Sequence, residues 1–121
     1  MKAFSSTNTT REVMATVSVE PDEEMYYIKF TFGTGGILFT YTVTEPDIVE
    51  MDEWRKLAKG ESASLNFYQG NGDGSIYSNN GAVKFVSSPS GSGGDTIAEF
   101  IVAHAIIAEP LRAALTHIES Q

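Results

Sequence analysis

Apolar and polar residues alternate along most of the first half of the chain, which is the period of a β-strand with one buried face. Three such runs cover residues 13–19, 26–32 and 37–44. The segments between them, 20–24 and 33–36, are rich in acidic residues with proline or in glycine, which is typical of turns. We therefore predict a meander of three antiparallel strands whose apolar faces point toward one core.

The second half repeats this alternation in shorter runs. Apolar positions at 63, 65 and 67 and at 83 and 85 flank a glycine-rich turn at 70–74 and the hairpin dipeptide Asn80-Gly81. The apolar spacing across 96–118 fits either a strand or a helix. We favour a strand over 96–103, followed by a helix from about Glu109 with Pro110 in its first turn, where proline is tolerated. The buried face of that helix is expected to comprise Leu111, Ala114, Leu115 and Ile118.

A first helix is predicted around Trp54, between the two series of strands. Asp47 and Glu50 have the spacing of a capping box, and Gly60 suits the end of the helix. The fold class is therefore α+β: one antiparallel sheet of about six or seven strands, with one or two helices packed on one face and a helix at the C-terminus. Residues 1–121 form a single domain, in which 1–10 and 87–95 are expected to be flexible.

Strands followed by a Glu-Pro dipeptide and a helix occur twice, at Glu45-Pro46 and at Glu109-Pro110. This pattern indicates a weak internal β-β-β-α duplication. The doubled strand-strand-strand-helix order resembles the organisation of Whirly-type single-strand binders, which pair sheets with helices and assemble as oligomers. The resemblance covers topology only, with no shared motif, and it implies a single-stranded nucleic-acid-binding oligomer.

The charge balance favours a different partner. The 121 residues include 16 acids and 8 lysines and arginines, a net charge of −8. Nucleic-acid binding depends on Lys and Arg that neutralise phosphates, so the total charge makes nucleic acid an unlikely partner. Two acidic clusters suit a basic protein partner instead: Asp22, Glu23, Glu24, Asp47, Glu50, Asp52 and Glu53. These positions are also ones where turns and helix starts favour acids, so solvated surface is the alternative interpretation.

Catalytic chemistry has little support in the sequence. The absence of cysteine excludes disulfides, thiol nucleophiles and thiolate metal sites. His104 and His117, the only histidines, lack a metal-binding spacing, and no nucleophile elbow occurs. We therefore predict that the protein is not an enzyme and needs no cofactor or metal. The chain shows neither a signal core nor an apolar run of membrane-spanning length, which predicts a cytoplasmic protein without a membrane association.

Two functional hypotheses remain. The first is a small acidic non-catalytic protein–protein interaction module, such as an inhibitor, an immunity-type protein or a phage accessory protein. The alternative is the single-stranded nucleic-acid-binding oligomer that the Whirly-like order implies. Either would be a homo-oligomer, most simply a dimer, because strands rich in Thr, Tyr and Phe leave edges that a second copy can cover.

Overall fold

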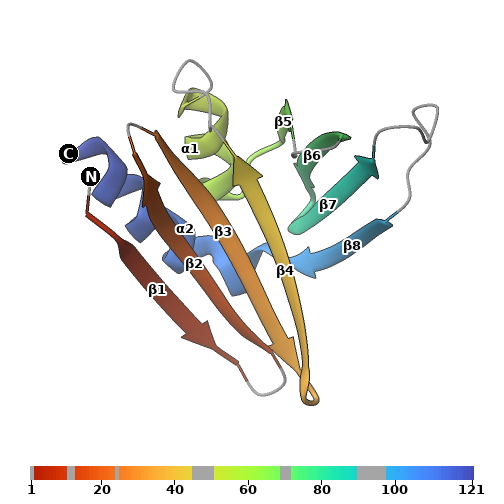
Figure 1. Ribbon diagram of the computed structural model, residues 1–121. Helices are drawn as coiled ribbons and strands as arrows, with labels where there is room; N and C mark the ends of the chain where they lie inside the picture. The colour runs from red at the N-terminus through yellow and green to blue at the C-terminus, as the bar shows by residue number, and fades with distance from the viewer. Residues whose placement is uncertain (1, 11–12, 24, 45–50, 69–71, 90–97) are drawn as a thin grey trace.

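The computed structural model describes residues 2–10, 13–23, 25–44, 51–68, 72–89 and 98–121 (Figure 1). Within these residues the chain forms eight strands and two helices in the order ββββα–ββββα. The elements are β1 (Phe4–Thr9), β2 (Met14–Asp22), β3 (Met25–Thr34), β4 (Ile37–Thr44), α1 (Met51–Lys59), β5 (Ala63–Tyr68), β6 (Gly72–Asn79), β7 (Ala82–Pro89), β8 (Ala98–Ala103) and α2 (His104–Glu119).

The strands form two antiparallel sheets, with orders β1-β2-β3-β4 (sheet A) and β5-β6-β7-β8 (sheet B). The predicted α+β class, antiparallel pairing and C-terminal helix are confirmed, but the predicted single sheet of six or seven strands is wrong. Alternation indicates which face of a strand is buried, not which edges pair. Because α1 separates β4 from β5, the second run of strands forms its own sheet and buries its apolar face against that of the first.

The N-terminal segment is a strand, which corrects the expectation that residues 1–10 are flexible. β1 pairs with β2 from Phe4 opposite Val19 to Thr9 opposite Met14. The Ser/Thr/Asn-rich sequence of β1 has no alternation, so its strand state comes from tertiary contacts instead. One such contact is the ring of Phe4, which stacks on His117 of α2 with ring centroids 4.8 Å apart.

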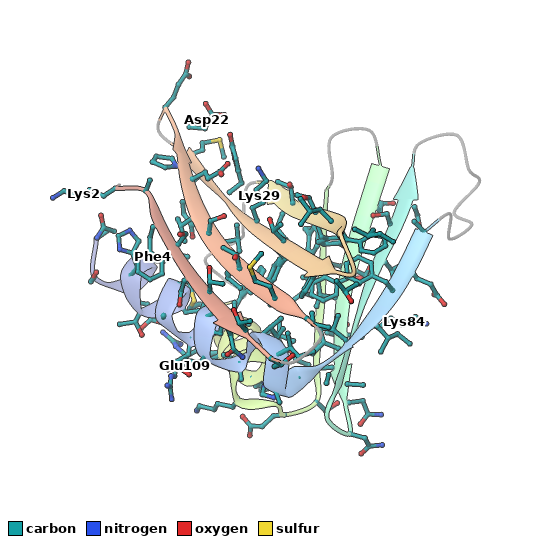
Figure 2. The ribbon with its side chains drawn as sticks, turned by 90° about the horizontal axis from the view of Figure 1, so that it is seen from below. Lys2, Phe4, Asp22, Lys29, Lys84 and Glu109 are labelled. Atoms are coloured by element: carbon teal, nitrogen blue, oxygen red, sulfur yellow. The ribbon has the colours of Figure 1, made fainter. Side chains whose placement is uncertain are left out.

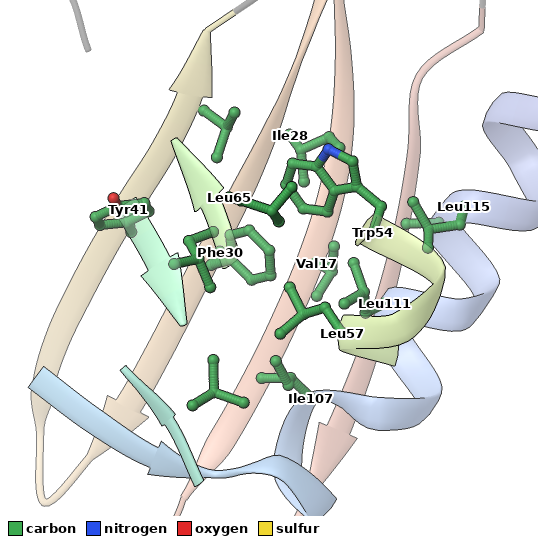
Figure 3. Packing of buried hydrophobic residues seen from close by; sticks show 14 of the residues in the cluster. Val17, Ile28, Phe30, Tyr41, Trp54, Leu57, Leu65, Ile107, Leu111 and Leu115 are labelled. Atoms are coloured by element: carbon green, nitrogen blue, oxygen red, sulfur yellow. The ribbon is translucent and has the colours of Figure 1, made fainter. Parts of the chain in front are cut away.

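One apolar core fills the space between the sheets and the helices (Figure 3). Phe30 of β3 and Phe85 of β7 meet at its centre, with ring centroids 5.1 Å apart, and Trp54 of α1 stacks on Phe30. The helix face predicted to be buried is buried: Leu111, Ala114, Leu115 and Ile118. Among the described residues, both sheets and both helices contribute side chains to this one core.

The two helices are exchanged between the halves of the chain. α1 follows sheet A and packs against β5 of sheet B, whereas α2 follows sheet B and packs against β1 and β2 of sheet A. The helices also contact each other. The repeated unit is therefore ββββα instead of the predicted β-β-β-α, and each half is completed by the helix of the other.

α2 begins at His104, five residues before the predicted start, so Pro110 lies inside the helix. The strand predicted over 96–103 is confirmed as β8, Ala98–Ala103. Proline has no N–H, so Pro110 cannot donate a hydrogen bond to the carbonyl of Ile106 one turn earlier. The side-chain amide of Asn8 in β1 donates to that carbonyl at 3.1 Å. A strand that carries little sequence signal thus supplies the bond that an internal proline removes.

The first helix ends as predicted. Gly60 follows α1 with φ of +82°, the left-handed conformation that glycine adopts most readily. The predicted capping residues Asp47 and Glu50 lie outside the described residues. Of the loop expected at 87–95, residues 87–89 are the end of β7, and residues 90–95 lie outside the described residues. Neither described helix combines the length and apolarity needed to cross a lipid bilayer.

Candidate binding surfaces

The face of sheet A that points away from the core is rich in hydroxyl groups. Thr7, Thr16, Thr31 and Thr40 lie opposite one another on the four adjacent strands. The hydroxyls of Thr7 and Thr16 are hydrogen-bonded at 2.8 Å. The neighbouring row comprises Ser5, Ser18, Lys29 and Thr42. Among the described residues, this outer face therefore offers many neutral donors and acceptors and one cation.

Lys29 is that cation, and Glu20 is its ion-pair partner. The Lys29 Nζ lies 3.8 Å from a carboxylate oxygen of Glu20, and both side chains are partly exposed. Tyr27, which is opposite Glu20 in the sheet register, provides an aromatic ring on the same face. A lysine, a tyrosine and a field of hydroxyls thus share one side of sheet A.

The outer face of sheet B has a corresponding arrangement. Lys84 and the exposed Tyr77 are opposite each other in the register of β6 and β7, and Lys84 Nζ lies 3.2 Å from Glu99. Ser75 donates a hydrogen bond to the Asn66 side chain at 2.9 Å. A hollow of about 470 Å³ lies beside this pair, lined by Asn66, Phe67, Asp73, Gly74 and Ser75.

The two lysines occupy equivalent positions in the repeat. Each lies in the third strand of its sheet, one residue before a central core phenylalanine, Phe30 for Lys29 and Phe85 for Lys84. Because the inner faces of the sheets pack against each other through these two rings, the outer faces point away from each other. Figure 2 shows the lysines well apart, on different sheets. Each outer face therefore carries one lysine at an equivalent position. The tyrosines differ in place: Tyr27 lies two residues before Lys29 on the same strand, whereas Tyr77 lies opposite Lys84 on the neighbouring strand.

The end of the β3–β4 hairpin is apolar and exposed. Met14, Ile37, Leu38 and Phe39, which we call the hairpin patch, have exposed fractions of 39, 57, 68 and 48%. Beside the patch lies a hollow of about 490 Å³ lined by Thr9, Thr10, Val13, Met14, Gly33, Thr34, Gly35, Gly36, Ile37 and Leu38. None of these described lining residues is charged. Phe39 also stacks on Phe100 of β8, with ring centroids 5.8 Å apart.

The acidic residues predicted to bind a partner do not form one free surface. Asp22 and Glu23 are exposed at the turn between β2 and β3. Asp52 and Glu53 lie in the first turn of α1, where they pair with Arg55 at 2.7 Å and with Lys56 at 3.0 Å. Glu24, Asp47 and Glu50 lie outside the described residues.

Glu53 is held within the molecule by two further features. Its carboxylate accepts a hydrogen bond from the backbone N–H of Ser64 at 3.1 Å. The hydrogen bond from Lys56, followed by that from Ser64, holds the pKa of Glu53 below its ordinary value. This carboxylate links α1 to the start of β5, so its contacts are structural.

The histidines also make structural contacts. His104 Nε2 lies 3.0 Å from the carbonyl oxygen of Ala58 at the end of α1, and His117 Nε2 lies 2.7 Å from the carbonyl oxygen of Lys2. Within the described part of the chain, no three His, Asp or Glu side chains gather closely enough to hold a metal ion. These contacts connect α2 to α1 and to the N-terminal segment.

Sequence reasoning missed the hairpin patch because alternation assigned Ile37 and Phe39 to the core. Both belong to the inward-facing series of β4, but Figure 1 shows that the hairpin extends past β8, so little covers its end. Three consecutive large apolar residues, Ile37, Leu38 and Phe39, interrupt the alternation. That interruption is the signal that could have identified an apolar strand end.

Comparison with known proteins adds no family assignment. No protein-family model matches the sequence, and no curated protein matches it.

Proposed function

We propose that the protein is a non-catalytic module that binds single-stranded nucleic acid on the outer faces of its two sheets. The observation that carries this proposal is that each outer face carries a lysine with an aromatic ring nearby. Lys29 and Lys84 occupy equivalent positions on two open sheets, each with a tyrosine and polar side chains nearby. Such faces can bind a phosphate backbone and stack bases at the same time.

The ion pairs of the two lysines leave them available to phosphate. Lys29 and Glu20, and likewise Lys84 and Glu99, are partly exposed pairs. Pairs of this kind contribute at most about 1 kcal/mol, so a phosphate can replace the glutamate at little cost. The neighbouring hydroxyls of sheet A are donors of the type that contact phosphate oxygens.

The tyrosines provide the second part of the interaction. Tyr77 is exposed beside Lys84, and Tyr27 lies on the outer face near Lys29. Stacking of one base on an aromatic side chain contributes about 1–3 kcal/mol and depends little on sequence. Binding would therefore tolerate many base sequences and require unpaired bases.

The net charge of −8 works against phosphate binding, and so does the charge of the described outer faces themselves. On the described outer faces, two lysines stand against Glu20, Asp22, Asp73 and Glu99, a balance of −2 (2 − 4). Because each face carries one described lysine, the logarithm of the binding constant of each face should fall with the logarithm of salt concentration with a slope of about −0.7. Stacking, which is insensitive to salt, would supply most of the affinity.

The topology supports the same function by analogy. The sequence predicted a doubled strands-then-helix order that resembles Whirly-type single-strand binders, and the observed ββββα–ββββα order retains that doubling with four strands in each sheet. Fold-level analogy is weaker support than the residues of the faces themselves.

Fluorescence anisotropy with labelled single-stranded DNA and RNA oligonucleotides of mixed sequence tests the proposal, with the matching duplex as a control ligand. Lys29→Gln and Lys84→Gln should each weaken binding at their own face and remove the salt slope of about 0.7 there. Lys59→Gln, which makes the same charge change on α1, should leave binding unchanged. Failure of the wild-type protein to bind single strands, or equal weakening by all three variants, would overturn it.

A basic protein partner is the second candidate, and the exposure of Asp22 and Glu23 supports it. This turn lies at the end of sheet A where β4 also ends, shortly before α1 in the sequence. A partner that docks there should be captured from lysate after nuclease treatment and be lost from the double variant Asp22→Asn, Glu23→Gln. Capture that requires intact nucleic acid, or that survives this double variant, would reject the second candidate.

A further inference from the structure

The hollow on sheet B lies close to Tyr77 and has the size of a small-molecule site. Its volume is about 470 Å³, and it is lined by Asn66, Phe67, Asp73, Gly74 and Ser75. Ser75 lies two residues before Tyr77 on β6, so the two side chains share the outer face, about 7 Å apart. One nucleotide of an extended single strand can cover this distance. A base next to one that stacks on Tyr77 therefore reaches the hollow.

A hydrogen bond fixes the amide of Asn66 at this hollow. The Ser75 hydroxyl donates to Asn66 Oδ1 at 2.9 Å, between opposite residues of β5 and β6. Because the amide oxygen is engaged, Asn66 offers its two N–H donors to a ligand. The backbone of Ser75 is anchored as well, since its carbonyl accepts a hydrogen bond from the Tyr41 hydroxyl at 3.2 Å. The donor side of the hollow is therefore preorganised.

Asp73 supplies the acceptors of the hollow. It is exposed on β6 and forms no ion pair with another described residue, whereas Glu99 on the same sheet is paired with Lys84 at 3.2 Å. An ionised carboxylate has two oxygens that accept hydrogen bonds and no donor. Asp73 is diagonal to Asn66 in the register, a relation that places Cα atoms about 7–8 Å apart. A carboxylate and an amide can therefore contact one ligand from neighbouring strands.

The nucleic-acid bases differ in how well they match this pair. The Watson–Crick edge of guanine carries two adjacent N–H donors, at N1 and N2, beside the carbonyl oxygen O6. The donors match a carboxylate, and O6 matches an amide N–H. Adenine and cytosine place a ring-nitrogen acceptor at the centre of this edge, which an ionised carboxylate repels. Thymine and uracil have one N–H between two carbonyl oxygens. Guanine is therefore the base that uses both side chains.

We propose that the hollow between Asn66 and Asp73 binds a guanine base of a single strand whose neighbouring base stacks on Tyr77. The Asp73 carboxylate accepts hydrogen bonds from N1–H and N2–H, and the Asn66 amide donates to O6. This inference rests on the proposed binding of single strands and adds a base preference at one position of sheet B. It also gives a role to Asp73, whose charge opposes phosphate on this face.

Fluorescence anisotropy of the wild-type protein tests the preference with four thymine-rich DNA oligonucleotides that differ only at one central base. Guanine should bind roughly tenfold more tightly than adenine or thymine at that position. Inosine, which lacks the N2 amino group but keeps N1–H and O6, should bind with intermediate affinity. Equal affinity for all four oligonucleotides would overturn this inference and leave the proposed function intact. No binding of any of them would remove the function on which the inference rests.

A matched pair of variants tests the role of the carboxylate. Asp73→Asn replaces one acceptor by an N–H donor, so it should abolish the preference for guanine while the all-thymine oligonucleotide still binds. Glu109→Gln makes the same change of charge on the exposed surface of α2 and should keep the preference. Guanosine monophosphate should compete weakly, because it has no neighbouring base for Tyr77. A preference that survives Asp73→Asn, or competition by this nucleotide as strong as by the guanine oligonucleotide, would contradict the proposal.

Discussion

The bond between Asn8 and α2 makes a specific prediction about stability. Asn8→Ala removes the amide that donates to the Ile106 carbonyl at 3.1 Å, and Pro110 prevents the helix from supplying a substitute. A carbonyl left without a donor in a buried setting costs about 1–3 kcal/mol, and Ile106 is only half-buried. We therefore expect Asn8→Ala to lower the free energy of unfolding by about 1–2 kcal/mol. Asn8→Asp, which keeps the shape of the side chain but loses the donor, should cost at least as much.

A double-mutant cycle with Pro110→Ala isolates this bond from other effects. Alanine at position 110 has an N–H that can donate to the Ile106 carbonyl within the helix. Asn8→Ala should therefore cost about 1 kcal/mol less in the Pro110→Ala background than in the wild type, a coupling typical of groups that share one partner. The Pro110→Ala change itself should not destabilise strongly, since the gain in helix propensity offsets the lost packing of a buried ring.

Urea denaturation gives the free energy of unfolding of the four proteins in this cycle: the wild type, Asn8→Ala, Pro110→Ala and the double variant. Trp54 is the only tryptophan and is buried in the core, so its fluorescence reports global unfolding. An equal cost of Asn8→Ala in both backgrounds would show that Asn8 does not compensate for the proline. The account of why β1 forms would then be wrong.

Three other substitutions test the packing between elements. Tyr41→Phe should cost about 1 kcal/mol, because the Tyr41 hydroxyl donates across the core to a backbone carbonyl of sheet B. Burial raises the pKa of Tyr41, so the tyrosine of the unfolded chain ionises first as pH rises. The free energy of unfolding should therefore fall above about pH 10. Urea titrations of Tyr41→Phe should show a smaller fall. Gly60→Ala should lower the melting temperature more than Gly35→Ala. Both glycines have a positive φ, but a Cβ atom at position 60 would lie 2.9 Å from the ring of His104, whereas one at position 35 would meet no atom within 4 Å. Leu115→Ala should cost about 3 kcal/mol in urea denaturation, and a loss below about 1 kcal/mol would contradict its burial.

Local pattern was sufficient for most strands and for the buried face of α2. Alternation places Val17, Phe30 and Phe85 on inward faces, and all three are fully buried. Glycine at position 60 marks the end of α1 because its φ is positive. These features depend on residues close in sequence, which is the information that periodicity contains.

Features that depend on distant contacts were not predicted. Polar β1 is a strand because β2 pairs with it and because Asn8 bonds to α2, almost a hundred residues away. The same contact lets α2 continue through Pro110, where sequence rules place a boundary. The division into two sheets depends on which edges pair, and alternation carries no information about edges.

The candidate surfaces were likewise only partly predictable from the sequence. Lys29 and Lys84 belong to outward-facing series in the sequence, but their equivalence appears only when the two sheets are compared in register. The acidic positions Asp52 and Glu53 were predicted from composition, yet contacts with Arg55, Lys56 and Ser64 engage them within the molecule. Charge counts cannot distinguish a free carboxylate from one that holds a helix in place.

The central proposal is that the outer sheet faces bind single strands, and chemical-shift mapping tests it most directly. An isotopically labelled sample of this 121-residue chain would be titrated with an unlabelled single-stranded oligonucleotide. We predict that the amide signals of β3 around Lys29 and of β6 and β7 around Tyr77 and Lys84 shift with one saturation curve on each face. Shifts confined to the Asp22–Glu23 turn and α1, or no shifts at saturating oligonucleotide, would contradict binding on the sheets.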